Sequence, residues 1–137
     1  MAQIILISAM RCNFNKEIRM EKMNVKPATG KLGVLCVGLG AVTSTFMTGV
    51  LMARKGLAKP VGSMTQYDKM RVGRGENKKY LHYGEIVPLA TLDDIVFGAW
   101  DVYPANAYES AVNAEVLQEK DILPVKEELE KIVPMKA

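Results

Sequence analysis

The chain has 137 residues, of which 49% are hydrophobic and 24% charged, a balance that is ordinary for one globular domain with a real core. Its formal net charge of +3 is small, so the composition does not call for a nucleic acid as partner. No apolar run reaches the ~20 residues that cross a bilayer, so we expect no membrane segment.

Residues 1–30 differ in character from the rest. They hold Met10, Met20 and Met23 without an amphipathic period, and we predict a poorly ordered extension in which Met20 or Met23 is the true start. The apolar run 4–7 resembles a short signal core, but no basic residue precedes it and no cleavage site follows, so we expect no secretion. The chain's cysteines have neither metal-ligand nor disulfide-framework spacing, which fits a cytoplasmic location.

Residues 34–45 are the most informative stretch. Residues 32–37 end in a valine-rich run typical of a strand that is buried on both faces of a parallel sheet. Gly38 permits a tight turn, and Gly40 has no side chain to block a phosphate. A helix predicted over 42–55 would direct free N–H groups and its positive dipole end at that anion. The alternative is a glycine-bearing turn that binds nothing.

The third glycine of the Gly-x-Gly-x-x-Gly pattern is replaced by Thr43, whose hydroxyl, with those of Ser44 and Thr45, can bond phosphate oxygens. In the predicted helix, the apolar face comprises Val42, Phe46, Val50 and Ala53. Lys55 and Gly56 predict its end. A strand expected at 61–67 would complete a right-handed βαβ unit.

Further elements follow in order. Residues 68–84 predict a small hairpin with 80–83 as one arm, and Thr91 predicts a cap for a helical turn within 88–94. A third buried strand is expected at 95–99, followed by Trp100 and Asp101 at its carboxyl end, where ligands bind in open α/β sheets. We predict helices at 105–117 and 124–132 and no closing strand. The last helix has its apolar stripe at Val125, Leu129 and Ile132.

These elements predict an α/β fold: a partial, Rossmann-like, doubly wound sheet with mainly parallel strands, apparently truncated. Asp68 and Asp101 are both candidates for the acid that holds an adenosine ribose, and the position of Asp101 after the third strand favours it. A basic cluster, composed of Arg71, Arg74, Lys78 and Lys79, indicates a solvated loop rather than a phosphate or nucleic-acid patch. His82 is interpreted as a surface or packing residue, and no metal site is expected.

Three passages together resemble the N-terminal part of the inositol-phosphate synthase family over residues 31–137. They are the turn 37–40 leading into 43–45, the segment Gly-Ser-Met-Thr-Gln at 62–66, and Gly-Ala-Trp-Asp-Val at 98–102 with the helix after it. The resemblance implies an NAD-binding, Rossmann-like domain in which residues matching Gly40, Ala41, Val42, Ser44 and Thr45 lie along the dinucleotide and Asp101 holds the ribose. With Gly38 and Thr43 from the turn, these are the predicted cofactor-binding residues.

The resemblance also implies a redox-neutral isomerisation of glucose 6-phosphate to inositol 1-phosphate by oxidation, aldol cyclisation and reduction. The family's catalytic residues, the glucose 6-phosphate pocket and the oligomer-forming domain of its homo-oligomeric members lie beyond the matched segment. We therefore predict no catalytic residue here and a chain that is inactive alone. The alternatives are a stand-alone dinucleotide-binding regulatory module, the cofactor half of an NAD-dependent dehydrogenase, and a fragment that binds no dinucleotide.

Overall fold

A computed structural model describes Lys26 and residues 29–137, so nearly all of the extension predicted at 1–30 lies outside the described residues. The helices and strands are, in chain order, β1 (Leu32–Val37), α1 (Ala41–Arg54), α2 (Met64–Tyr67), β2 (Lys69–Val72), β3 (Lys79–His82), α3 (Tyr83–Ile86), β4 (Ile95–Asp101), α4 (Ala107–Asn113), α5 (Glu119–Ile122), α6 (Lys126–Glu130) and β5 (Met135–Lys136). Short 3-10 turns occupy Gly75–Asn77, Leu92–Asp94 and Leu123–Val125. None of the helices in this part of the chain has the length and apolar character that crossing a bilayer demands.

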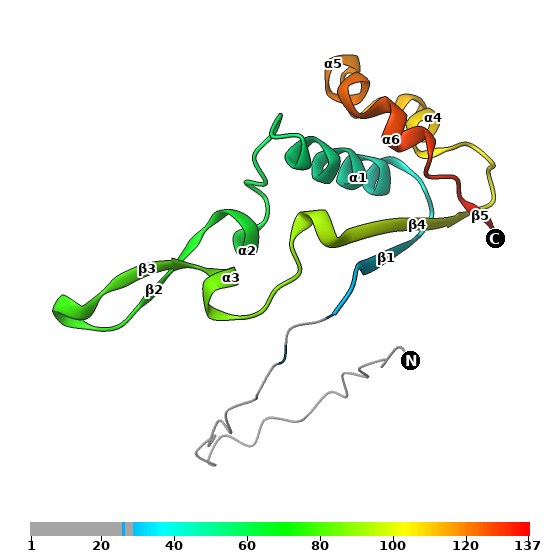
Figure 1. Ribbon diagram of the computed structural model, residues 1–137. Coiled ribbons are helices and arrows are strands. Elements are labelled where there is room, and N and C mark those ends of the chain that lie inside the picture. Colours follow the sequence, from blue (N-terminus) through cyan, green and yellow to red (C-terminus); the bar gives the residue numbers. More distant parts are fainter. Residues whose placement is uncertain (1–25, 27–28) are drawn as a thin grey trace, which may run out of the picture.

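The main sheet is parallel and has the order β1-β4-β5. Leu32 pairs with Ile95 at one end of the β1–β4 ladder and Val37 with Trp100 at the other. Helices α1, α4 and α6 all lie on one face of this sheet (Figure 1). The fold is therefore two-layered in residues 29–137, and the predicted α/β class with parallel strands is confirmed.

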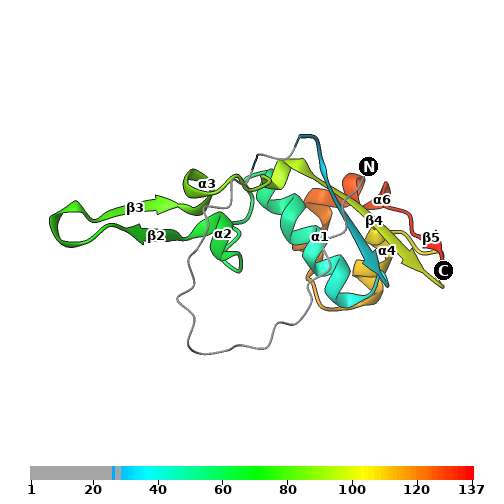
Figure 2. The ribbon, with the colours of Figure 1, turned by 90° about the horizontal axis from the view of Figure 1, so that it is seen from below.

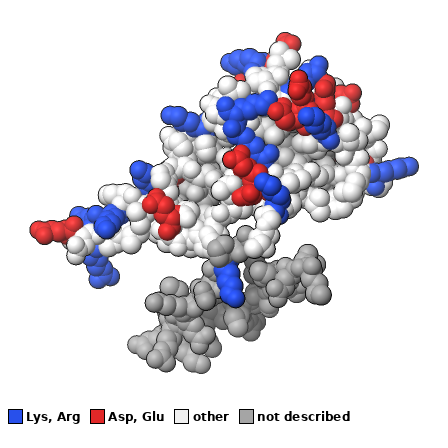
Figure 3. Space-filling view, in the orientation of Figure 1, with Lys and Arg blue, Asp and Glu red and all other residues white. Residues whose placement is uncertain are grey.

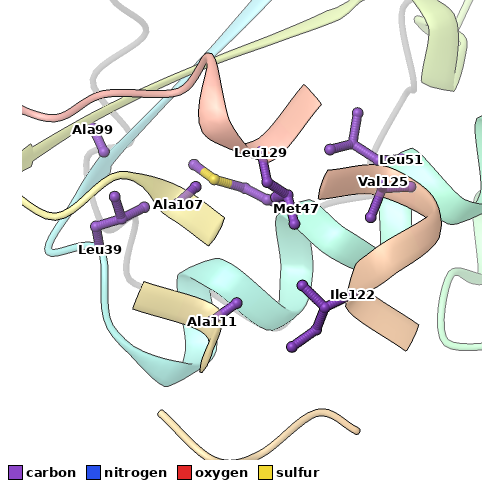
Figure 4. Packing of buried hydrophobic residues seen from close by; sticks show 9 residues of the cluster. All are labelled: Leu39, Met47, Leu51, Ala99, Ala107, Ala111, Ile122, Val125 and Leu129. Atoms are coloured by element: carbon purple, nitrogen blue, oxygen red, sulfur yellow. The ribbon is translucent and has the colours of Figure 1, made fainter. Parts of the chain in front are cut away.

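The core lies between α1 and the α4–α6 helices, with one wall from the sheet (Figure 4). Met47, Val125 and Leu129 are fully buried at its centre. Burying each of these side chains contributes about 2 kcal/mol relative to exposure, which makes this cluster the main source of stability. The predicted stripe of the last helix is confirmed at Val125 and Leu129.

Two predictions about burial were wrong in part or in whole. Of the apolar face predicted for α1, Val50 is buried, but Val42 is 85% and Phe46 44% exposed, and the buried face also holds Met47 and Leu51. The helix is apolar on several sides, and contact with α4, α5 and α6 selects the Met47 side. Val37 in β1 is 89% exposed instead of buried on both faces, because the helices cover only one face of the sheet.

Two strand predictions were also wrong. Residues 61–67 form a turn and the short helix α2, since Ser63 caps a helical turn directly after a Pro60-Val61-Gly62 turn. Consequently β1 pairs directly with β4, and the connection between them contains no strand of the main sheet. The closing strand that the sequence did not predict is β5, whose Met135 pairs with Trp100.

Other elements match the predictions closely. The end of α1 has Lys55 as its cap and Gly56 at φ +69°, with Leu57 N–H bonded to the Met52 carbonyl at 3.0 Å. The hairpin forms as β2 and β3, which project away from the sheet and helices (Figure 2). Helix α4 is shorter than predicted, because Glu115 adopts φ +53° after it.

Candidate functional site

The turn between β1 and α1 is fixed by the strands beside it. Gly38 has φ +89°, a conformation that favours glycine, and its N–H continues the ladder by donating to the Trp100 carbonyl at 2.8 Å. The side chain of Leu39 is 2% exposed and belongs to the core cluster. The turn is therefore anchored both through its backbone and through its central side chain.

Asp101 completes this anchoring from the end of β4. Its Oδ2 accepts the Leu39 N–H at 2.6 Å, and its Oδ1 accepts the Tyr103 N–H at 3.0 Å. The backbone N–H of Tyr103, and then that of Leu39, hold the pKa of Asp101 below its ordinary value because they stabilise the carboxylate. The side chain thus stays charged at neutral pH and fixes the middle of the glycine turn.

The N-terminus of α1 points free donors out of this turn. Gly40 is the N-cap residue of the helix, no side chain makes a capping hydrogen bond there, and the first turn contains no acidic residue. The first intrahelical bond runs from Ser44 N–H to the Gly40 carbonyl at 2.9 Å, so the preceding N–H groups are available to an anion. A Cβ added at Gly40 would meet no atom within 4 Å. The chain's own packing therefore does not require glycine here, and the open space fits an approaching phosphate.

The three hydroxyl side chains of the first turn have different surroundings. Thr43 Oγ1 donates to the Gly38 carbonyl at 2.8 Å, which closes the turn from the helix side. Ser44 is 1% exposed, and its Oγ donates to the Ala41 carbonyl at 3.2 Å. Thr45 lines a cavity along the outer side of α1. Thr43 and Ser44 can still accept hydrogen bonds, but both hydroxyl protons are directed at backbone carbonyls.

Two cavities lie near α1 and β4, and they differ in chemistry. The larger, about 650 Å³, runs along α1 and is mostly apolar, with Phe46, Val50 and Ile95 in its wall. A smaller one, about 340 Å³, lies at the carboxyl end of β4 and is lined by Asp101, Tyr103 and Lys136 among others. We place the candidate site at the glycine turn and Asp101, because the Asp101 carboxylate bonds the turn and the free N–H groups of α1 follow directly after it.

The two acids predicted as candidates for the ribose contact, Asp68 and Asp101, lie in different parts of the fold. Asp68 follows α2 at the base of the hairpin, and the strand that would have brought it to the carboxyl edge of the sheet does not form. His82 is exposed at the end of β3, and the basic cluster lies exposed on the hairpin. Among the described residues no group of three or more His, Cys, Asp or Glu is placed to hold a metal ion.

Sequence reasoning did not find the contact between Asp101 and the Leu39 N–H. The two residues are 62 positions apart, and only the parallel pairing of β1 with β4 brings them together. One feature of the sequence indicates it: Leu39 and Asp101 each lie at or just after the carboxyl end of a predicted strand. Parallel strands have their carboxyl ends at the same edge of a sheet.

Known proteins are similar to this chain over most of its length. The NAD-binding model of the myo-inositol-1-phosphate synthase family matches residues 32–137. Inositol-3-phosphate synthase 1 of Bacteroides thetaiotaomicron is 56% identical over 117 residues, which cover 85% of this chain and 27% of that protein. Inositol-3-phosphate synthase isozyme 1 of Arabidopsis thaliana is 30% identical over 147 residues, covering 96% of this chain and 26% of that protein.

A solved structure shares the fold. The crystal structure of inositol-3-phosphate synthase from Caenorhabditis elegans superposes with a TM-score of 0.69 at 27% sequence identity, covering 80% of this chain and 24% of that one. The chain spans about a quarter of the length of the relatives it matches. These matches fall on the segment that contains β1, the glycine turn, α1 and β4.

Proposed function

The chain belongs to the myo-inositol-1-phosphate synthase family, and from this premise we propose that it acts as the NAD-binding part of an inositol-3-phosphate synthase. Its cofactor is NAD, as the matched domain of the family indicates. The observation that supports the location of the site is the glycine turn itself, which Asp101 fixes in front of an uncapped helix N-terminus.

We assign the pyrophosphate to the N–H groups at the start of α1. Gly38 and Gly40 shape the turn, and Ala41, Val42 and Thr43 supply the first helical N–H groups. Their donors are unpaired within the helix, and the helix dipole adds positive potential at the same point. Ser44 and Thr45 complete the predicted set: Ser44 packs beneath the first turn, and Thr45 lies on its outer side.

The adenosine ribose is assigned to Asp101. Each carboxylate oxygen accepts one backbone N–H, and a carboxylate has about four lone-pair sites, so further sites are left for ribose hydroxyls. The cavity beside Asp101 gives space for that ring. Two backbone bonds also fix the side chain's rotamer before the cofactor arrives, which lowers the entropy cost of binding.

The activity proposed for the whole protein is the isomerisation of glucose 6-phosphate to inositol 1-phosphate within a homo-oligomer. NAD supplies the hydride acceptor and, after reduction, the hydride donor for such a reaction. The part played by residues 29–137 is to bind and orient the dinucleotide. We assign no catalytic residue to residues 29–137, because the carboxylate at the site, Asp101, holds two backbone N–H groups and is assigned to the ribose.

Calorimetric titration of NAD into the chain tests the proposal, with Asp101→Ala and Asp68→Ala as a matched pair. Both replace one aspartate with alanine and change the net charge equally. We expect saturable binding that Asp101→Ala abolishes and Asp68→Ala leaves unchanged. Loss with Asp68→Ala alone would favour the dehydrogenase alternative. A folded chain with no saturable NAD signal would contradict the proposal.

A further inference from the structure

Two side chains hold the peptide group that joins Gly38 to Leu39. Its N–H, which belongs to Leu39, donates to Asp101 Oδ2 at 2.6 Å, and its carbonyl, which belongs to Gly38, accepts the Thr43 hydroxyl at 2.8 Å. The bond is trans, so the N–H and the carbonyl point in opposite directions from one rigid plane. Asp101 at the end of β4 and Thr43 in the first turn of α1 therefore restrain the same unit from opposite sides.

The glycine before this peptide restrains it little. Gly38 has φ +89°, and a Cβ added there would meet no atom within 4 Å. Rotation of the peptide changes ψ of Gly38 and φ of Leu39, and glycine adopts a wide range of ψ without steric cost. The Gly38 N–H and the Leu39 side chain are both anchored, but neither fixes the plane between them. The hydrogen bonds of the peptide's own N–H and carbonyl therefore decide its orientation.

The two partners of the peptide have different hydrogen-bonding capacities. The ionised carboxylate of Asp101 only accepts, so it favours the N–H and repels the carbonyl oxygen. The Thr43 hydroxyl has one proton, which it donates to the Gly38 carbonyl, so the same proton is not available to a phosphate oxygen. This hydrogen bond is partly buried, and loss of the hydroxyl would leave the carbonyl without that donor.

The orientation of this peptide affects both halves of the proposed site. The Leu39 N–H is one of the two backbone donors that fix the Asp101 carboxylate. The same peptide precedes Gly40, the N-cap residue whose carbonyl begins the hydrogen bonds of α1. A peptide that turned away would release the carboxylate on one side and displace the free N–H groups of the helix on the other.

We propose that the Thr43 side chain is a positioning group of the dinucleotide site, which fixes Asp101 and the glycine turn through the Gly38–Leu39 peptide and does not itself hold the phosphate. The inference rests on the proposed function for the identity of the ligand. It also gives a physical reason for threonine at the third position of the Gly-x-Gly-x-x-Gly pattern, since glycine there would leave the Gly38 carbonyl without this donor. The backbone N–H of Thr43 keeps the role assigned to it above.

Titration of the Asp101 carboxyl carbon by NMR, without any ligand, is the first test. The backbone N–H groups of Tyr103 and Leu39 hold the pKa of Asp101 below its ordinary value. In Thr43→Val the freed peptide should weaken the Leu39 bond, so the pKa of Asp101 should rise toward its ordinary value. Thr43→Ser keeps the hydroxyl and should keep the low pKa. Lys136, a charged group that lines the cavity beside Asp101, is the same in every variant.

Thr48→Val is the matched control. Thr48 lies in the same helix and is 2% exposed, and its Oγ1 has no hydrogen-bond partner among the described residues. The substitution removes a hydroxyl from α1 as Thr43→Val does, but breaks no bond to the turn. It should leave both the pKa of Asp101 and the NAD affinity unchanged, whereas a general effect of valine on the packing of α1 would appear in both variants.

Titrations with NAD and with adenosine then separate positioning from direct contact. Thr43→Val should bind NAD about three- to tenfold more weakly than the parent, and Thr43→Ser should bind within about twofold of it. Adenosine carries the ribose but no phosphate. Because the proposed role acts on Asp101 as well as on the helix, Thr43→Val should weaken adenosine binding too, which chemical-shift titration measures. A hydroxyl that contacted only the phosphate would affect NAD alone.

Three results would overturn the inference: an unchanged pKa of Asp101 in Thr43→Val, weaker NAD binding with unchanged adenosine binding, or an equal effect in Thr48→Val. A parent chain with no saturable NAD signal would contradict the proposed function instead, and the ligand-free titration would still decide whether Thr43 holds the peptide. Circular dichroism checks that each variant is folded. Thr43→Ala, which also lacks the hydroxyl, takes the place of Thr43→Val if that variant is unfolded.

Discussion

The turn at residues 38–40 and the hairpin at residues 69–82 (at the lower left in Figure 3) differ in the number and kind of contacts that each makes with the rest of the chain. In the turn, the N–H groups of Gly38 and Leu39 have partners in β4, and the Leu39 side chain is 2% exposed in the core. In the hairpin, the strands pair only with each other, and seven of their eight residues are exposed.

This difference separates two kinds of surface. The turn is held by hydrogen bonds to β4 and by the buried Leu39 side chain, and it leaves open space at Gly40 in front of free helical N–H groups. Such a site suits a small anionic ligand, because little ordering is needed on binding. The hairpin strands pair only with each other and leave most of their side chains exposed, so nothing in the hairpin is pre-formed around a small ligand.

The largest effect should come from the core that anchors the turn. Leu129→Ala removes a fully buried side chain between α6 and α1 and should lower the free energy of unfolding by about 2–5 kcal/mol. Met70→Ala on the hairpin should change it by less than about 0.5 kcal/mol, since Met70 is 38% exposed. Urea denaturation followed by circular dichroism measures both. Equal effects would mean that the hairpin belongs to the cooperative core.

Gly40→Val should separate binding from folding. A Cβ at Gly40 meets no atom of the chain and the backbone φ is −89°, so the variant should fold normally. Its side chain would occupy the space in front of the helix and lower the NAD affinity by more than about tenfold, as loss of one charge-assisted hydrogen bond does. Calorimetry measures this, with Gly49→Ala as a helix control outside the site. Unchanged NAD affinity in Gly40→Val would place the phosphate elsewhere.

Asp101→Asn should loosen the turn without changing the size of the side chain. An amide supplies only one of the two oxygens that accept backbone N–H groups in the carboxylate, so we expect the variant to be less stable than the parent near neutral pH. Because folding lowers the pKa of Asp101, its stabilisation is complete above the unfolded-state pKa and is lost as pH falls through the folded-state pKa. Denaturation at pH 7 and pH 3 should therefore show a gap between parent and variant that narrows in acid. A gap of constant size would contradict this role.

The smallest effect concerns Glu115, which ends α4 at φ +53° without being glycine. Glu115→Gly should raise the free energy of unfolding by about 1 kcal/mol, because glycine adopts this conformation without the steric cost. Thermal unfolding measures this effect. A variant less stable than the parent would contradict the conformational argument.

The local signals in the sequence predicted the elements that depend on short-range chemistry. The valine-rich run, the glycines and the Lys55-Gly56 end gave β1, the turn and α1 nearly as observed. Thr91 caps its turn with Asp94, and Asn106 caps α4 by accepting the Glu109 N–H. In each case the residues that decide the structure are within a few positions of one another.

What the sequence did not predict depends on long-range contact. The two-residue strand β5 has no pattern of its own and exists because the end of β4 offers a partner. The buried face of α1 is chosen by helices more than 50 positions later. The role of Asp101 in fixing Leu39 likewise requires the register of β1 on β4, so the acid was predicted as a ligand contact but not as part of the turn.

Chemical-shift mapping of backbone amides during NAD titration tests the central claim most directly. We expect the amide signals of residues 38–45 and 101–103 to shift and saturate together, whereas the chemical shifts of residues 69–82 stay unchanged. Saturable shifts in the hairpin, or along the outer cavity of α1 with none at Leu39–Thr43, would contradict the assignment of NAD to the glycine turn.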